Sequence, residues 1–124
     1  MIAEGSELSV LSLDLFASSD VETHRMVSLA GAYPAPGGLA FGATTAPMGA
    51  GRMGTVSVYG LALVQAGEPF AKDVPLMCGA DGTAVPHDGS GSKFPIGRSV
   101  SDAQAGDVVS VWLIPCAGLP VSAP

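Results

Sequence analysis

The clearest alternation of apolar and polar residues lies near the C-terminal end of the chain, just after Asp107. Successive side chains of an extended strand point to opposite faces, so Val109, Val111 and Leu113 fall together on one face. Pro115 cannot donate to a ladder of backbone hydrogen bonds and marks the end of the run. The pattern predicts a strong β-strand between these two punctuating residues.

A second segment repeats this pattern earlier in the chain, because Val56-Ser-Val-Tyr59 matches Val109-Ser-Val-Trp112. Two further matches occur in the same order, Phe41-Gly42 with Ile96-Gly97 and Val27-Ser-Leu-Ala-Gly-Ala32 with Val74-Pro-Leu-Met-Cys-Gly-Ala80. We interpret them as two repeat units, at about 21–60 and 68–114, each with a strand, a loop, a short strand ending in Gly, a connector and a strong strand. Coincidence is the alternative, since Val, Ser, Ala and Gly are abundant here.

The N-terminal segment also alternates, from Glu7 to Phe16, with a change of phase at Val10. Such a break is typical of a bulged strand, and the segment also suits an arm that pairs with another chain. We therefore divide the chain into an N-terminal arm or strand at 1–20, a single β domain at 21–116 and an extended C-terminal tail at 117–124.

The connectors between these strands are rich in Gly, Pro, Ser and Asp, which are turn-forming residues. We expect single helical turns or plain turns at 18–24 and 101–106, and a hairpin-type turn at Ala80-Asp-Gly82. The predicted fold class is all-β, a small β-barrel or β-tulip with an internal two-fold sequence repeat, short helical turns in connectors and an extended N-terminal arm.

The composition shows that the chain has few charged residues for a water-exposed surface. Charged residues make up 13% of the 124 residues, about half the usual share. A surface so poor in charge suits a subunit that partners cover, although a merely neutral surface of small residues is the alternative. The net charge of -6, with scattered cationic residues, argues against direct binding to nucleic acid.

Targeting signals are not apparent. No segment approaches the roughly 18 apolar residues of a membrane helix, and the N-terminus does not resemble a signal peptide. We therefore expect no membrane partner and synthesis in the cytoplasm, where Cys78 and Cys116 would be buried, reduced thiols.

The sequence contains no motif for zinc ligation, an activated serine or a phosphate loop. Gly49-Ala-Gly-Arg-Met-Gly54 matches the dinucleotide fingerprint formally, but a strand follows it where that motif needs a helix. We therefore expect no enzyme, and no catalytic, cofactor-binding or metal-binding residues. Two alternatives remain open, a carbohydrate-binding module using Tyr59 or Trp112 and a small hydrolase built on Cys78 and His87.

Several blocks of glycine and valine resemble the small capsid decoration (cement) proteins of tailed phages. The blocks are Val56-Ser-Val-Tyr-Gly-Leu-Ala-Leu-Val64 with Ala66-Gly67, Asp81-Gly-Thr-Ala-Val85, Pro95-Ile-Gly-Arg-Ser-Val100 and Ala103-Gln-Ala-Gly-Asp-Val-Val-Ser-Val-Trp-Leu113. The likeness spans roughly 25–113, and Ser99-Val100 stands where a small Ala is usual. It implies a non-enzymatic β-barrel or β-tulip that docks, often as a trimer, on the outside of an expanded capsid.

On this interpretation the partners are the major capsid protein and further copies of the chain, and the protein resides on the exterior of the virion capsid. A tail or baseplate protein is the other structural possibility. We hypothesise that the N-terminal strand faces the capsid, through Leu8, Val10, Leu11, Leu13, Leu15 and Phe16. We expect Tyr59 and Trp112, at matching places in the two repeats, to pack between subunits.

Overall fold

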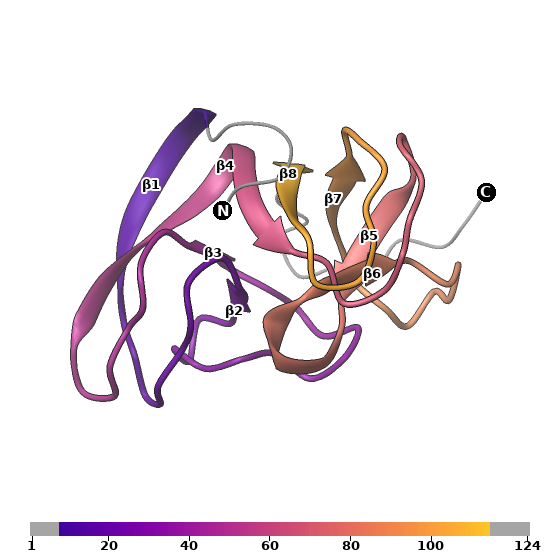
Figure 1. Ribbon diagram of the computed structural model, residues 1–124. Helices are drawn as coiled ribbons and strands as arrows, with labels where there is room; N and C mark the ends of the chain where they lie inside the picture. The colour runs from indigo at the N-terminus through magenta and orange to yellow at the C-terminus, as the bar shows by residue number, and fades with distance from the viewer. Residues whose placement is uncertain (1–7, 115–124) are drawn as a thin grey trace.

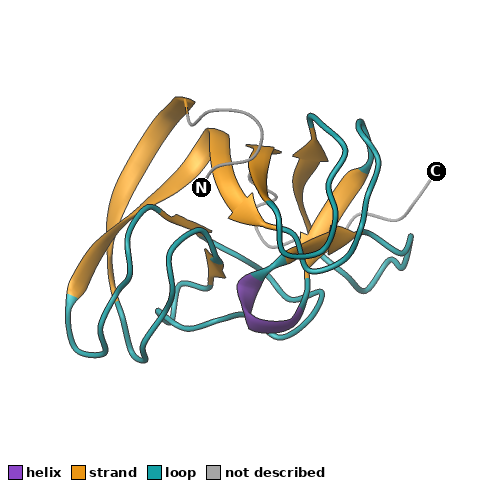
Figure 2. Cartoon of the chain, in the orientation of Figure 1, coloured by secondary structure: helices purple, strands orange, loops and turns teal. Residues whose placement is uncertain are grey.

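The regular secondary structure of the described residues is almost all β-strand, as the alternating patterns predict (Figures 1 and 2). A computed structural model describes residues 8–114, and its side chains are described from residue 11 onwards. The elements are β1 (Leu8–Phe16), β2 (Met26–Val27), β3 (Gly42–Thr44), β4 (Met53–Gln65), β5 (Pro75–Cys78), the 3-10 helix η1 (Ala80–Gly82), β6 (Ala84–Pro86), β7 (Pro95–Ser99) and β8 (Val108–Leu113). Cys116 and the expected C-terminal tail lie outside the described residues.

The strands form one antiparallel sheet that curls into a nearly closed barrel, so the predicted barrel is confirmed. The sheet order is β2-β3-β4-β8-β7-β5-β6, and β1 pairs with β4 beside this path. The register of β1 against β4 shifts on either side of Leu11, which makes β1 a bulged strand of the chain's own sheet. In Figure 1, β1 and the first part of β4 form a long ribbon that extends beyond the barrel.

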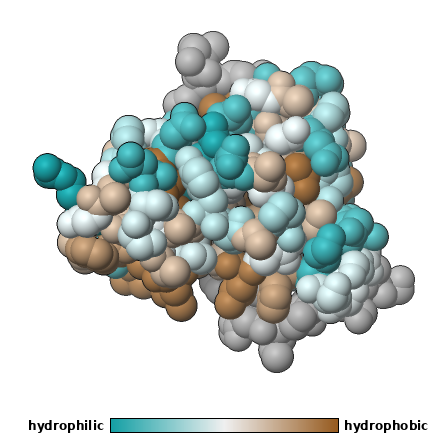
Figure 3. Space-filling view, turned by 90° about the horizontal axis from the view of Figure 1, so that it is seen from below, coloured by the Kyte–Doolittle hydropathy of each residue, from teal (hydrophilic) through white to brown (hydrophobic). Residues whose placement is uncertain are grey.

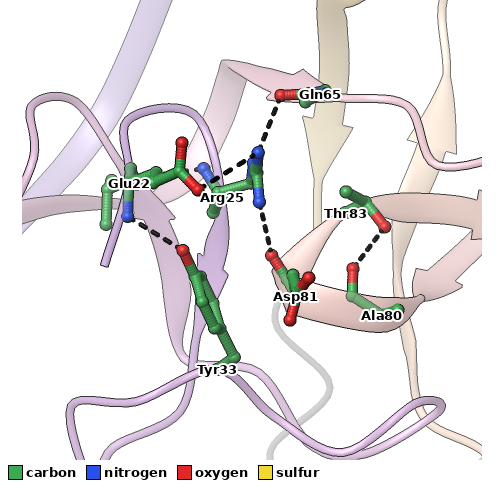
Figure 4. A network of polar contacts seen from close by, with 8 residues as sticks. Glu22, Arg25, Tyr33, Gln65, Ala80, Asp81 and Thr83 are labelled. Atoms are coloured by element: carbon green, nitrogen blue, oxygen red, sulfur yellow. Dashed lines mark hydrogen bonds and ion pairs between the residues drawn. The ribbon is translucent and has the colours of Figure 1, made fainter. Parts of the chain in front are cut away.

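The barrel closes where η1 approaches β2. The Arg25 guanidinium donates hydrogen bonds to the Asp81 carbonyl oxygen and to Gln65 Oε1, each at 3.0 Å (Figure 4). Gly82 lies so close to Met26 that an added Cβ would collide with the Met26 carbonyl oxygen. These contacts join the two ends of the sheet, which share no strand ladder.

Two clusters of buried apolar residues hold the fold together. The first fills the barrel and includes Met26, Ala43, Ala62, Val64, Leu76, Cys78, Ile96, Val109 and Val111. The second lies beneath the ribbon of β1 and β4 and comprises Leu15, Ala17, Val21, Val27, Met48, Val56 and Val58. Because Leu15 belongs to the second cluster, β1 contributes to the core as well as to the surface.

The connectors are mostly turns. The only helical turn in the described residues is η1, whereas 18–24 and 101–106 contain plain turns and isolated bridges. Asp81 and Gly82 both have positive φ, as expected of a hairpin-type turn, and they connect the antiparallel pair β5 and β6.

The two halves of the chain share one backbone arrangement. Val21 and Met48 exchange both backbone hydrogen bonds at 2.8 Å, and Phe70 and Ala103 do the same at 3.0 and 2.9 Å. Three residues after the first member of each pair, the chain adopts a left-handed conformation, at His24 (φ 61) and at Asp73 (φ 65). The two bridges and their turns therefore occupy equivalent places.

β1 has a structural counterpart in the second half of β4. Phe16 lies opposite Met53 at the last pair of the β1–β4 ladder, and Gln65 lies opposite Val108 at the last pair of the β4–β8 ladder. Each ladder is followed by an alanine, Ala17 or Ala66, that accepts from a turn glycine. β1 is thus the first strand of the first half, and β4 serves both halves.

This equivalence corrects two of the three sequence matches. Arg52 and Asp107 accept the backbone hydrogen bonds of Ala17 and Ala66, so counting onward from them pairs Val56 with Val111. The sequence match assigned Val56 to Val109, which is wrong by two residues, and the Val27 match slips in the same way. A shift of two residues keeps every side chain on its own face of a strand, so the apolar pattern cannot detect it.

Candidate interaction surfaces

The apolar residues of β1 divide between core and surface. Leu15 is buried in the second cluster, whereas Leu11, Leu13 and Phe16 are exposed. Leu8 and Val10 lie within β1, but their side chains are outside the described residues. A strand with this many exposed large apolar side chains is typical of a surface that another molecule covers.

β4 extends this exposed area across the ladder. Phe16 lies opposite Met53, and their side chains are 56% and 61% exposed. The sequence alone does not point to Met53, because only its pairing with Phe16 brings it to this surface. We call Leu11, Leu13, Phe16 and Met53 the β1 surface. It covers both faces of the ribbon, because Leu13 shares the face of Leu15 whereas Phe16 and Met53 point to the opposite face, and Leu11 lies opposite Tyr59. Figure 3 shows hydrophobic residues gathering at the left of the view, the side on which Figure 1 places β1 and β4.

Tyr59 and Trp112 lie on one face of the sheet. Trp112 is opposite Leu61, which is two positions from Tyr59 on β4, and the two aromatic side chains are 39% and 45% exposed. The expectation that they hold matching places in the repeats is wrong, since Trp112 corresponds to Ser57. They are instead diagonal neighbours across the β4–β8 ladder. We call Tyr59, Leu61 and Trp112 the aromatic surface.

An ion pair borders the aromatic surface. Arg98 lies opposite Trp112, and its Nε donates to Asp73 Oδ1 at 2.7 Å. The hydrogen bond and the positive charge of Arg98 lower the pKa of the Asp73 carboxyl from its usual 3.8. The carboxyl therefore stays ionised in mildly acidic solution, and the pair adds a polar edge to an apolar face.

The loop that follows β6 carries a second ion pair, Lys93 with Asp88, at 3.0 Å. The Ser90 backbone N–H, then the Lys93 ammonium, lower the pKa of the Asp88 carboxyl. The contacts of Asp88 with the Ser90 N–H and with the Lys93 ammonium fix the conformation of this loop.

The residues proposed for a hydrolase do not come together. Cys78 is fully buried in the barrel core at one end of β5. His87 lies beside Pro75 at the other end, where its Nδ1 accepts from the Gly89 N–H and its Nε2 lies 3.1 Å from the Lys93 carbonyl oxygen. Three residues of extended strand separate the two by about 10 Å, so they form no nucleophile–base pair.

Within residues 8–114, no three His, Cys, Asp or Glu residues are grouped closely enough to hold a metal ion. The glycines of 49–54 lead directly into β4, so the helix that a dinucleotide site requires is missing there. In the described part of the chain, no helix has the length and apolar character needed to cross a membrane.

Comparison with known proteins assigns a family. A sequence profile described as phage cement protein matches residues 6–114. Among solved structures, the N base of the head fiber gp8.5 in bacteriophage phi29 superposes with a TM-score of 0.68. It is 24% identical, and the match covers 91% of this chain and 98% of that one, which shows a shared fold. A search of curated protein sequences finds no match.

Proposed function

Since the chain belongs to the phage cement protein family, we propose that it binds the outer surface of the mature phage head as a trimer and stabilises the capsid lattice. The profile match over residues 6–114 carries this proposal. The exposed apolar surfaces add physical support, because they provide contact area that a solitary chain leaves uncovered.

Stabilisation would follow from mass action. A protein that binds only the assembled lattice favours that lattice by its binding free energy. A trimer presents three copies of each contact at once, so interfaces that are weak individually hold firmly together through avidity. This role requires no chemistry at a catalytic site.

We assign the capsid contact to the β1 surface, with Leu8 and Val10 kept in the prediction. Comparison of the two halves supports this. Leu13 corresponds to Ala62 of β4, which is fully buried in the same apolar cluster as Met26 and Ala43, whereas Leu13 remains 42% exposed. The first half therefore lacks a cover that the second half receives from β2 and β3, and the capsid would supply it.

We assign the contact between subunits to the aromatic surface. Tyr and Trp are enriched where protein interfaces bind most strongly, because they bury a large area at little cost in conformational entropy. Tyr59 and Trp112 lie side by side, and Arg98 at their border offers a charged partner for the rim of such an interface.

The test is co-sedimentation of the full chain with emptied, expanded heads. Saturable binding, with a native mass near three chains by light scattering, supports the proposal. A chain that stays in the supernatant at micromolar concentration overturns capsid binding, and a monomeric mass at those concentrations overturns the trimer.

A carbohydrate-binding role is the second candidate, because exposed aromatic rings beside a polar ion pair also suit stacking against sugars. Tyr59 and Trp112 next to Arg98 and Asp73 provide such a platform. A glycan array distinguishes the two roles: specific signals that a Trp112→Ser variant loses would favour sugar binding, and an array without signals would exclude it.

A further inference from the structure

An open groove of about 630 Å³ lies at the loop end of the first half, away from the barrel core. Its residues come from three loops: Asp20, Val21, Glu22, Thr23, Tyr33, Pro47, Met48 and Gly49. Three of them, Val21, Met48 and Tyr33, belong to or pack against the second apolar cluster. The groove thus has an apolar floor that is continuous with the core.

Backbone and side-chain hydrogen bonds hold this groove in shape. The bridge between Val21 and Met48 joins two of its loops. The Tyr33 hydroxyl accepts from the Glu22 N–H at 3.0 Å (Figure 4), and Asp20 Oδ1 accepts from the Ala50 N–H at 2.9 Å. A partner would therefore meet a preformed surface, which lowers the entropic cost of binding.

The rim of the groove is negative. Asp20 and Glu22 are both exposed, and the Glu22 side chain is 74% exposed. Arg25 approaches Glu22 only to 3.7 Å, and its own side chain is largely buried and hydrogen-bonded to Gln65 and Asp81. Among the described residues, no Lys, Arg or His lines the groove, so the potential at its mouth favours a cation.

The second half of the chain shows that the fold does not require these acids. Because Phe70 is equivalent to Val21, the counterparts of Asp20 and Glu22 are Pro69 and Ala71. The same bridge and the same left-handed turn form there without acids at these two positions, although Glu68, Asp73 and Asp102 lie nearby. The bridge and the turn therefore do not by themselves require acids at positions 20 and 22.

We propose that this groove docks an extended segment of the capsid protein that carries a Lys or Arg side chain. The apolar part of the segment would pack on Tyr33, Pro47 and Met48, while its cation would lie between Asp20 and Glu22. Complementary charge at a rim directs association and fixes register, and an apolar floor slows dissociation. This inference rests on the proposed function and adds a second, charged contact to the β1 surface.

The experiment compares Asp20→Asn/Glu22→Gln with the full-length wild type in binding to emptied, expanded heads at several salt concentrations. Asn can still accept from Ala50, so folding and melting temperature should be unchanged. We expect about tenfold weaker binding at low salt and a flatter dependence on salt, because the screened attraction is gone. Glu68→Gln is the matched control, an exposed acid of the second half that should bind as wild type.

A second variant tests the floor of the groove. Pro47 is exposed and has no N–H to lose, so Pro47→Lys should fold normally and block the groove with bulk and positive charge. If wild type binds heads and both groove variants bind equally well, the groove proposal is wrong and the capsid function stands. The groove proposal is also wrong if Glu68→Gln weakens binding as much as the double variant does. If wild type itself does not bind, the proposed function fails.

Discussion

Thr44 and Ser99 make the same pair of hydrogen bonds in the two halves of the chain. The Thr44 hydroxyl accepts from the Arg25 N–H at 3.1 Å and donates to the Glu22 carbonyl oxygen at 2.7 Å. The Ser99 hydroxyl accepts from the Val74 N–H at 2.9 Å and donates to the Ala71 carbonyl oxygen at 2.7 Å. Each buried hydroxyl thus fastens a left-handed turn to the edge of a strand.

Removing either hydroxyl should destabilise the fold, because backbone groups would then be buried without a partner. We expect Thr44→Val and Ser99→Ala each to lower the free energy of unfolding by about 2 kcal/mol. Thr44→Ser is the control, because it keeps the hydroxyl and loses one methyl group worth about 1 kcal/mol. Urea denaturation measures all three, and a Thr44→Val variant as stable as Thr44→Ser would refute this role.

Gly97 should tolerate no side chain. Its φ is +156°, and an added Cβ would collide with the Trp112 carbonyl oxygen in the neighbouring strand. We expect Gly97→Ala to lower stability by about 3 kcal/mol or more. Gly49→Ala is the comparison, because its Cβ would meet Arg52 at an ordinary 3.5 Å and should have little effect. Similar melting temperatures for the two variants would contradict the close approach of β7 and β8.

The ion pair of Asp73 and Arg98 predicts a dependence of stability on pH. Since folding lowers the pKa of Asp73, its contribution is present above the unfolded value near 3.8 and disappears as pH falls through the folded value. Asn also tolerates the left-handed backbone of position 73, so Asp73→Asn removes only the charge. The melting temperatures of wild type and variant should differ at pH 7 and converge in strong acid. A constant difference would exclude this linkage.

The two exposed surfaces should respond differently to mutation. Phe16→Ser and Leu13→Ser should weaken binding to heads and leave the native mass unchanged, because they alter only the β1 surface. Trp112→Ser should lower the native mass, as measured by light scattering. Val100→Ser, an exposed apolar position outside both surfaces, controls for general loss of apolar area. The assignments are reversed if Trp112→Ser abolishes capsid binding while the trimer persists.

Point variants are preferable to removing the N-terminal strand. Leu15 is buried with Val56 and Val58, so deletion of β1 would open the second cluster as well as remove the proposed contact. A loss of binding in such a truncated chain could reflect unfolding alone.

The all-β barrel was predictable because its strands alternate with a period of two and are separated by turn residues. The order of the repeat was predictable for the same reason, but its register was not. A shift of two residues still aligns a Val with a Val, and only the turn at Gly51 and the one at Gly106 fix the correct alignment. Sequence alone could not decide whether β1 joins the sheet of its own chain or pairs with another chain, since alternating leucines suit both arrangements.

The interaction surfaces were predictable only in part. Tyr59 and Trp112 were recognised as candidates, although their proximity depends on the β4–β8 register. Met53 and the groove around Tyr33 were not recognised, because strand pairing and an isolated bridge bring together residues that are distant in sequence.

The central claim is that this chain binds the expanded head and makes it harder to break. The most direct measurement is the temperature at which DNA-filled, expanded heads rupture, with and without a saturating amount of the protein. We predict a higher rupture temperature for heads decorated with wild type. Heads mixed with the Phe16→Ser variant at the same concentration should rupture at the same temperature as bare heads. Heads that are visibly decorated but rupture at the same temperature as bare ones would contradict the account.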